Sequence, residues 1–172
     1  MNCCSHIDCL HHWNSIQHGI MGRYKNFMSL PDKPFKFVSG TWEKGTQLFD
    51  MTTGIFIGGG IVDGEEGLFR GNAPLLKTNF GYMGITHKLD YDERKRKRYN
   101  NFLVEYNADL SIRRISKPFK LCASNIEFVT TFLELPNDEL FIGVTEMDDT
   151  PMGMVFDRKE LVSILYDGNN TR

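Results

Sequence analysis

A hairpin pattern near the middle of the chain indicates which class of fold the sequence forms. Residues 70–88 read RGNAPLLKTNFGYMGITHK, and they contain two short apolar segments joined by Asn79-Phe80-Gly81. Glycine adopts positive φ without steric cost, so Gly81 suits a tight turn between strands. We therefore expect Pro74–Thr78 to pair with Tyr82–Leu89 as an antiparallel hairpin.

Short extended segments and turn signals continue on both sides of this hairpin. The segments expected as strands are Phe35–Val38, Gln47–Asp50, Ile55–Ile57, Asn101–Tyr106, Ile112–Ile115, Ile126–Leu135, Leu140–Glu146 and Met152–Asp157. Strands at a spacing of about 8–12 residues are typical of an all-β sandwich, barrel or propeller rather than of βαβ units. A helix is expected only over Lys159–Leu165, with Asp157 as its N-cap.

The composition indicates one ordinary globular domain. The chain has 172 residues, of which 41% are hydrophobic and 24% charged, and its formal net charge of −2 gives no reason to expect nucleic acid as a partner. The segment Asp90–Arg98, DYDERKRKR, has no apolar period and is expected as an exposed, solvated loop. No apolar run approaches the ~20 residues that a membrane span needs, so no membrane contact is expected.

The first 24 residues differ from the rest and are expected to form a separate N-terminal arm before a domain over residues 25–172. They hold Cys3, Cys4 and Cys9 together with most of the histidines. The spacing lacks the paired knuckles of a zinc site, and the clustering does not resemble a secreted disulfide framework. We expect no metal, no cofactor and a reducing, cytoplasmic compartment.

Five motifs along the chain resemble those of one carbohydrate-active family. In chain order they are Lys25–Leu30 (KNFMSL), Phe69–Leu76 (FRGNAPLL), Gly81–His87 (GYMGITH), Ile115–Phe119 (ISKPF) and Ile126–Phe128 (IEF). With these motifs the chain resembles the C-terminal part of five-bladed β-propellers of the mannoside-phosphorylase type. It is most similar to the relatives that are associated with glycosyltransferases.

The resemblance implies an all-β fold: a partial β-propeller of about three blades of antiparallel meanders, with a short C-terminal helix. In this family the innermost strands line a central funnel, and loops at one rim hold sugar and, in phosphorylases, phosphate. At ~40–50 residues per blade a full propeller needs about twice this length, and the family's catalytic aspartate lies upstream of the matched region. We therefore expect open blade edges that the N-terminal arm, a second copy or another protein chain covers.

The resemblance also implies binding residues. Arg70, Asn72, Lys77 and His87 are expected to bind a glycan or sugar phosphate, because arginine offers a bidentate fork and lysine a point charge. Two residues before Arg70 the family carries a lysine where this chain has Leu68, so Arg70 would have to replace it. The alternative is that Arg70 and His87 bond neighbouring loops.

Two acidic residues are candidate catalytic groups, Glu127 and Asp148. Alternation along the strand puts Glu127, Val129 and Thr131 on one side, which either lines the funnel or lies on a solvated face. Asp148-Asp149 suits a rim acid or a turn. If Glu127 and Asp148 faced each other, they could form a general acid/base pair.

Two functions of different class remain open at this point. The first is a carbohydrate-active or glycan-binding protein related to propeller glycosidases and mannoside phosphorylases, without the main catalytic aspartate. The second is a non-catalytic structural or assembly module that kept the propeller fold. Convergence of Arg70, His87 and Glu127 on one place would favour the first.

Overall fold

The computed structural model describes residues 26–42, 45–53, 55–57, 69–147 and 149–166. In these ranges the chain forms the strands β1 (Met28–Ser29), β2 (Lys36–Trp42), β3 (Gly45–Asp50), β4 (Ile55–Ile57), β5 (Leu76–Lys77), β6 (Gly81–Tyr91), β7 (Lys97–Asn107), β8 (Ile112–Ile115), β9 (Glu127–Leu135), β10 (Glu139–Glu146) and β11 (Thr150–Asp157). A 3₁₀ turn, Pro136–Asp138, joins β9 to β10, and helix α2 (Arg158–Tyr166) follows β11. The predicted all-β class is confirmed. The predicted N-terminal arm, residues 1–24, lies outside the described residues.

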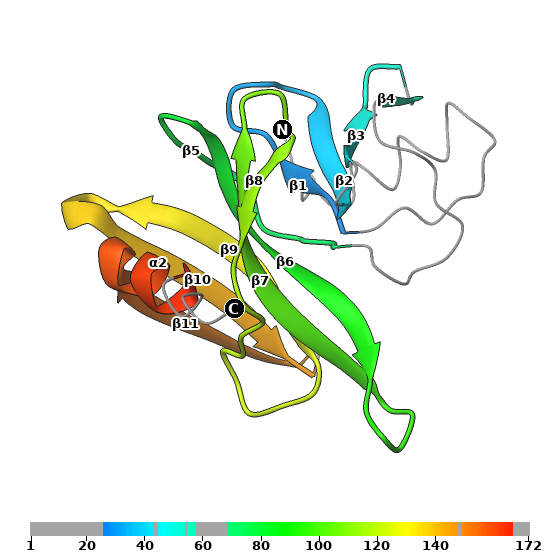
Figure 1. The fold of residues 1–172 in the computed structure, drawn as a ribbon, viewed down its shortest axis with the longest axis vertical. Coiled ribbons are helices and arrows are strands. Elements are labelled where there is room, and N and C mark those ends of the chain that lie inside the picture. The colour runs from blue at the N-terminus through cyan, green and yellow to red at the C-terminus, as the bar shows by residue number, and fades with distance from the viewer. Residues whose placement is uncertain (1–25, 43–44, 54, 58–68, 148, 167–172) are drawn as a thin grey trace, which may run out of the picture.

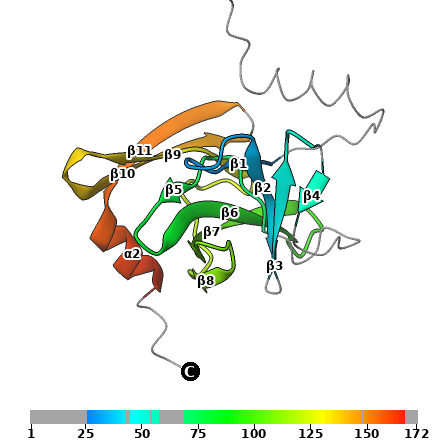
Figure 2. The ribbon, with the colours of Figure 1, turned by 90° about the horizontal axis from the view of Figure 1, so that it is seen from above.

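The described strands form three antiparallel sheets, and in each sheet the strands pair in the order of the sequence. The first sheet is β1-β2-β3-β4, the central sheet β5-β6-β7-β8 and the last sheet β9-β10-β11. Figures 1 and 2 show the central sheet, in green, between the blue first sheet and the yellow-to-orange last sheet. Each sheet is thus a meander, and the central one has a neighbour on either side.

The middle of the central sheet is buried on both faces, which explains the character of its sequence. In β6 the residues from Gly81 to His87 are all buried, without the alternation of a half-exposed strand. One core, between the first and central sheets, consists of Met28, Leu30, Val38, Leu75, Tyr82, Val104, Tyr106 and Leu110. The other core, toward the last sheet and α2, consists of Ala73, Met83, Ile85, Leu103, Val129, Phe132, Leu140, Ile142, Leu161 and Tyr166. Successive residues of β6 and β7 therefore contribute to opposite cores.

The predicted hairpin is confirmed, but its first strand is shorter than expected. Leu76 pairs with Met83 and Lys77 with Tyr82. Gly81 has φ +150°, and a Cβ there would lie 2.3 Å from the carbonyl oxygen of Tyr106, so only glycine fits this turn. Strand β5 has two residues because the N–H of Leu75 donates to Ser29 O (3.0 Å) in the first sheet. The preceding Pro74 has no N–H to donate to a ladder.

The segment Asp90–Arg98 is largely exposed, as predicted, and its central residues 92–96 form the expected loop, but both of its ends belong to strands. Strands β6 and β7 run through it to a short turn, so the hairpin extends beyond the other strands in Figure 1. The Asp92 carboxylate closes this turn: it accepts the backbone N–H groups of Arg94 and Arg96, each at 2.9 Å. Polar turn chemistry and backbone pairing stabilise this hairpin end, which explains why its sequence has no apolar period.

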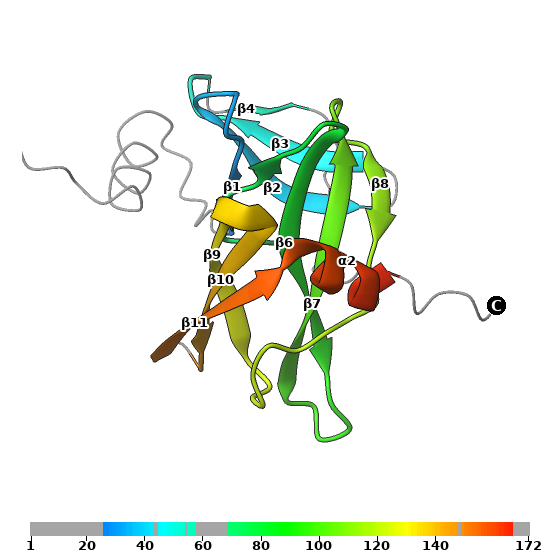
Figure 3. The same ribbon diagram turned by 90° about the vertical axis from the view of Figure 1, so that its left-hand side faces the viewer.

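Helix α2 packs against the second core, the one toward the last sheet. The predicted N-cap is confirmed, because Asp157 Oδ1 accepts the backbone N–H of Glu160 at 2.8 Å. Figure 3 shows α2, in red, leaving β11 at the side of the central sheet, where its Leu161 and Tyr166 are buried. Within the described ranges no helix combines the length and apolar character that crossing a lipid bilayer requires.

Candidate functional site

A row of polar side chains crosses the central sheet from strand to strand. Arg70 forms an antiparallel bridge with His87, His87 pairs with Asn101, and Asn101 forms a bridge with Phe119. The Arg70 N–H donates to His87 O at 2.9 Å. Directly opposed residues of a sheet point to the same face and lie about 4.5–5.5 Å apart at Cβ. Arg70, His87 and Asn101 therefore form one continuous polar row, on the face that looks toward the last sheet.

Glu127 joins this polar row from the last sheet. Its side chain is fully buried, at 0% exposure. Oε1 accepts a short hydrogen bond from Asn101 Nδ2 and a 3.0 Å bond from the N–H of Leu121, while Oε2 accepts the N–H of Cys122 at 2.8 Å. Three neutral donors thus compensate the carboxylate, which is the condition for burying it. The structure brings Glu127 next to Asn101 and so next to the Arg70–His87 pair.

The predicted alternation of β9 is correct for Glu127 and Val129 but wrong for Thr131. Val129 pairs with Val144 and Thr131 with Gly143, and the register shifts between those two pairs. The extra residue, Thr130, is a β-bulge, which moves every later side chain of β9 to the other face. Phe132 is therefore buried where strict alternation would have placed Thr131.

His87 is buried against two aromatic rings at the edge of the polar row. Its imidazole is 5% exposed and makes edge contacts with Tyr99 and Phe128, at 5.0 and 5.4 Å between ring centroids. Tyr99 and Phe128 also contact each other, at 5.0 Å. Both rings, like Arg70, are half-buried. A guanidinium and an imidazole beside apolar ring surfaces are the kinds of groups that line sites for small polar ligands.

Lys77 does not join the polar row. Lys77 pairs with Tyr82, five positions before His87 on β6, which is about 17 Å at ~3.4 Å per residue. Its Nζ lies 2.6 Å from Asp32 Oδ2 and 4.2 Å from the centroid of the Tyr82 ring. The hydrogen bond from Lys77 lowers the pKa of Asp32 and raises that of Lys77. Lys77 is thus held in an ion pair of its own.

Asn72 and Asp148 are the two remaining predicted residues. Asn72 follows Arg70 by two residues and is half-buried. Asp148 lies outside the described residues, and its neighbour Asp149 donates its N–H to Glu146 O at 3.0 Å in the turn between β10 and β11. The catalytic roles of Glu127 and Asp148 stay predictions. In the described geometry the Glu127 carboxylate holds the loop before β9.

Two members of this polar neighbourhood did not stand out in the sequence. Asn101 begins a predicted strand, yet its backbone lies opposite His87 and its side-chain amide donates to Glu127. Lys120 donates a short hydrogen bond to Tyr99 O, and burial lowers its pKa although the Glu127 charge opposes that shift. The two-residue period of the strand could have identified Asn101. Asn101, Leu103 and Glu105 share one face of β7, and that face is buried.

Comparisons with protein-family models, curated proteins and solved structures give no match for this chain. Among the residues that the structure describes, no three His, Cys, Asp or Glu side chains gather as a metal site. The function is therefore inferred from the polar row, from the arrangement of the sheets and from the resemblance of the sequence motifs.

Proposed function

We propose that this chain is a glycan- or sugar-phosphate-binding protein and that the polar row is its binding surface. The observation that carries this proposal is the in-register pairing of Arg70 with His87, beside the rings of Tyr99 and Phe128. Arginine supplies a planar fork for a phosphate or for paired hydroxyls, and imidazole a further donor or acceptor. The half-buried rings offer apolar surface to the C–H face of a sugar.

The sheet arrangement supports a partial β-propeller of about three blades as the architecture. Each sheet is a meander in sequence order, as a propeller blade is, and the central sheet is covered on both faces by its neighbours. The first strands of the central and last sheets, β5 and β9, lie close together, as innermost strands of adjacent blades would. The Arg70–His87 pair would then lie near the inner side of the second blade.

Binding without hydrolysis is the form of this function that the geometry favours. The Glu127 carboxylate is fully buried and accepts three hydrogen bonds from groups of the protein itself. A general acid has to reach the proton acceptor of its substrate within hydrogen-bond distance, and these contacts occupy the group instead. Glu127 then supports the site by fixing Asn101 and the Leu121–Cys122 backbone.

A second candidate function, an assembly module, is favoured by the outer face of the last sheet. There Leu133 and Val155 pair with Phe141 from either side, and they remain 45% and 54% exposed. The first and last sheets cover the two faces of the central sheet, whereas this apolar stripe is uncovered in the described part of the chain. A second copy or another protein chain would complete the stack at this face.

Calorimetric titration with mannosides, glucosides and inorganic phosphate tests the binding proposal. We expect at least one of these ligands to bind the wild-type protein. Arg70→Ala should weaken that binding by about 1.5–3 kcal/mol, the usual size of a charge-assisted hydrogen bond. Arg94→Ala, which removes an exposed arginine from the distant hairpin end, is the matched control and should bind as the wild type does. Equal affinity of the wild type and Arg70→Ala, or no binding at all, would reject the polar row as the site.

A further inference from the structure

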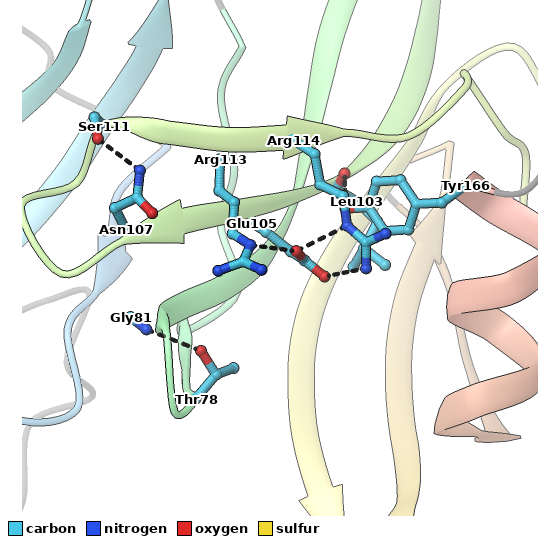
Figure 4. Close-up of polar contacts among 9 residues, drawn as sticks. All are labelled: Thr78, Gly81, Leu103, Glu105, Asn107, Ser111, Arg113, Arg114 and Tyr166. Carbon is cyan, nitrogen blue, oxygen red and sulfur yellow. Dashed lines mark hydrogen bonds and ion pairs between the residues drawn. The ribbon is translucent and has the colours of Figure 1, made fainter. Parts of the chain in front are cut away.

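A β-bulge turns two consecutive arginines toward one carboxylate on the central sheet. Glu105 of β7 pairs with Arg114 of β8, and the next residue, Tyr106, pairs with Ile112, so Arg113 is the extra residue. In a regular strand Arg113 and Arg114 would point to opposite faces, but a bulge lets both turn to one side. Figure 4 shows both guanidinium groups approaching the Glu105 carboxylate.

Arg114 neutralises this carboxylate. Its Nε and Nη2 donate to the two oxygens of Glu105, each at 2.8 Å, which is bidentate geometry. The Arg114 guanidinium also lies 3.8 Å from the centroid of the Tyr166 ring, and Tyr166 donates its hydroxyl to Leu103 O at 2.9 Å. Because Glu105 is only 3% exposed, the Arg114 ion pair is its main compensation.

Arg113 is placed differently and leaves a positive charge in surplus. Its Nε is 3.6 Å from Glu105 Oε2, beyond hydrogen-bond distance, and its guanidinium lies 4.6 Å from the centroid of the Phe80 ring. The side chain is 51% exposed. In Figure 4 it is Nε that faces Glu105, while the two terminal nitrogens lie off that line. The cation–π contact holds the guanidinium in place, and because the side chain is half-exposed, a ligand in solvent can reach it.

We propose that Arg113 is a second anion site, one that binds a carboxylate or phosphate group of a small ligand. Two arginines face one carboxylate, so the cluster carries one net positive charge, and the fork of Arg113 fits two oxygens of an oxyanion. The two oxygens can belong to a sugar carboxylate or to a phosphate, since both accept a bidentate arginine. Glu105 and Asn101 are four residues apart on β7, about 14 Å at ~3.4 Å per residue, which separates this site from the polar row.

Titrations with D-glucuronate and with inorganic phosphate, followed by NMR or calorimetry, test the site. We expect at least one of these two probes to bind the wild type at neutral pH. Arg113→Ala should weaken binding about tenfold or more, because it removes a charge-assisted, bidentate contact. Arg113→Lys keeps the charge but loses the fork, so it should weaken binding by a smaller factor. Arg94→Ala, another exposed arginine, should leave both affinities unchanged.

Three outcomes would overturn the site at Arg113. They are no binding of either probe to the wild type, equal losses in Arg113→Ala and Arg94→Ala, and loss of glucuronate binding in Arg70→Ala but not in Arg113→Ala. Arg70→Ala also separates this proposal from the polar row, since it should leave glucuronate binding at Arg113 intact.

Discussion

Two buried carboxylates face the second core, and the molecule compensates them in different ways. Glu127 is held by Asn101 and by two backbone N–H groups, all of them neutral, whereas Glu105 is held by arginines at the sheet surface. Neutral donors that belong to a loop fix that loop, and none of them carries a charge that attracts an anionic ligand. Charged partners that remain half-exposed can be solvated when the carboxylate is removed, and they can bind other anions. The first arrangement is therefore structural, and the second can also be functional.

The largest expected effect is that of Glu127→Ala. The substitution leaves two backbone N–H groups and the Asn101 amide without their acceptor in a buried place. We expect the free energy of unfolding to fall by about 3–5 kcal/mol, because each unsatisfied buried donor costs about 1–3 kcal/mol and water recovers part of this. Urea unfolding measures it, with Glu93→Ala, at an exposed turn position, as the control. A loss below about 1 kcal/mol would show that Glu127 does not hold the loop.

Glu105→Gln should have a smaller effect, which tests the difference between the two carboxylates directly. The introduced glutamine is close in shape to the glutamate, and Arg113 and Arg114 are about half-exposed, so water can solvate both guanidinium groups. We expect a loss of about 1–2 kcal/mol after allowing for solvent screening. The same urea experiment measures it. If this loss equals that of Glu127→Ala, the distinction between the two sites is wrong.

Tyr166→Phe should cost about 1 kcal/mol, the usual contribution of one hydrogen bond. The loss is small because Leu103 O, which accepts the Tyr166 hydroxyl, also accepts the N–H of Ser116 at 2.9 Å. The substitution should also make the stability less dependent on pH in the alkaline range. Burial first, and then the Glu105 charge, raise the pKa of Tyr166 above its ordinary value. The unfolded chain then loses this proton first, so stability is complete below pH ~10 and falls as the pH rises further.

Urea midpoints between neutral and alkaline pH check this sign. The decline in stability above pH ~10 should be shallower in Tyr166→Phe than in the wild type. Part of the decline should remain, because burial also raises the pKa of Tyr106, whose hydroxyl contacts Thr41 Oγ1 at 2.9 Å. An unchanged alkaline slope would mean that the Tyr166 hydroxyl is not buried in solution.

The smallest effect on stability is expected for substitution of the exposed carboxylate Asp32. Hydrogen bonds from Lys77 and then from Tyr82 lower the pKa of Asp32. The stability that this pair contributes is present above the ordinary pKa of about 3.8 and is lost as the pH falls through the lower folded value. Asp32→Asn should flatten acid unfolding slightly, and salt should reduce the difference, because both partners are largely exposed. An effect as large as that of Glu105→Gln would contradict this ranking.

Several elements of the fold could be predicted because their causes lie within a few residues. The Asn79-Phe80-Gly81 turn needs a backbone that glycine alone fits, and Asp157 caps the helix that begins beside it. The two ends of Asp90–Arg98 are strands, contrary to the loop prediction, because backbone pairing and the Asp92 turn hold them and neither leaves an apolar period. Turns and caps that depend on neighbouring residues can thus be predicted from the sequence, whereas strand pairing without apolar burial cannot.

The candidate sites divide in the same way. The motifs predict Arg70, His87 and Glu127 as site residues. The position of Asn101, opposite His87 and hydrogen-bonded to Glu127, follows from the register of β6 and β7. The Glu105 cluster was not anticipated at all. Its two arginines share a face only because β8 has an extra residue opposite β7, and no feature of the residues Ile112–Ile115 specifies that bulge.

The sequence by itself determined the all-β class, the positions of most strands and turns, and the capped C-terminal helix. These features depend on the two-residue period of a strand and on turn and cap preferences, which act between residues close in the chain. The tertiary structure decided which faces are buried, where the bulges at Thr130 and Arg113 fall, and which polar groups meet. Those outcomes depend on how three sheets fit against one another, and residues far apart in the chain settle that fit together.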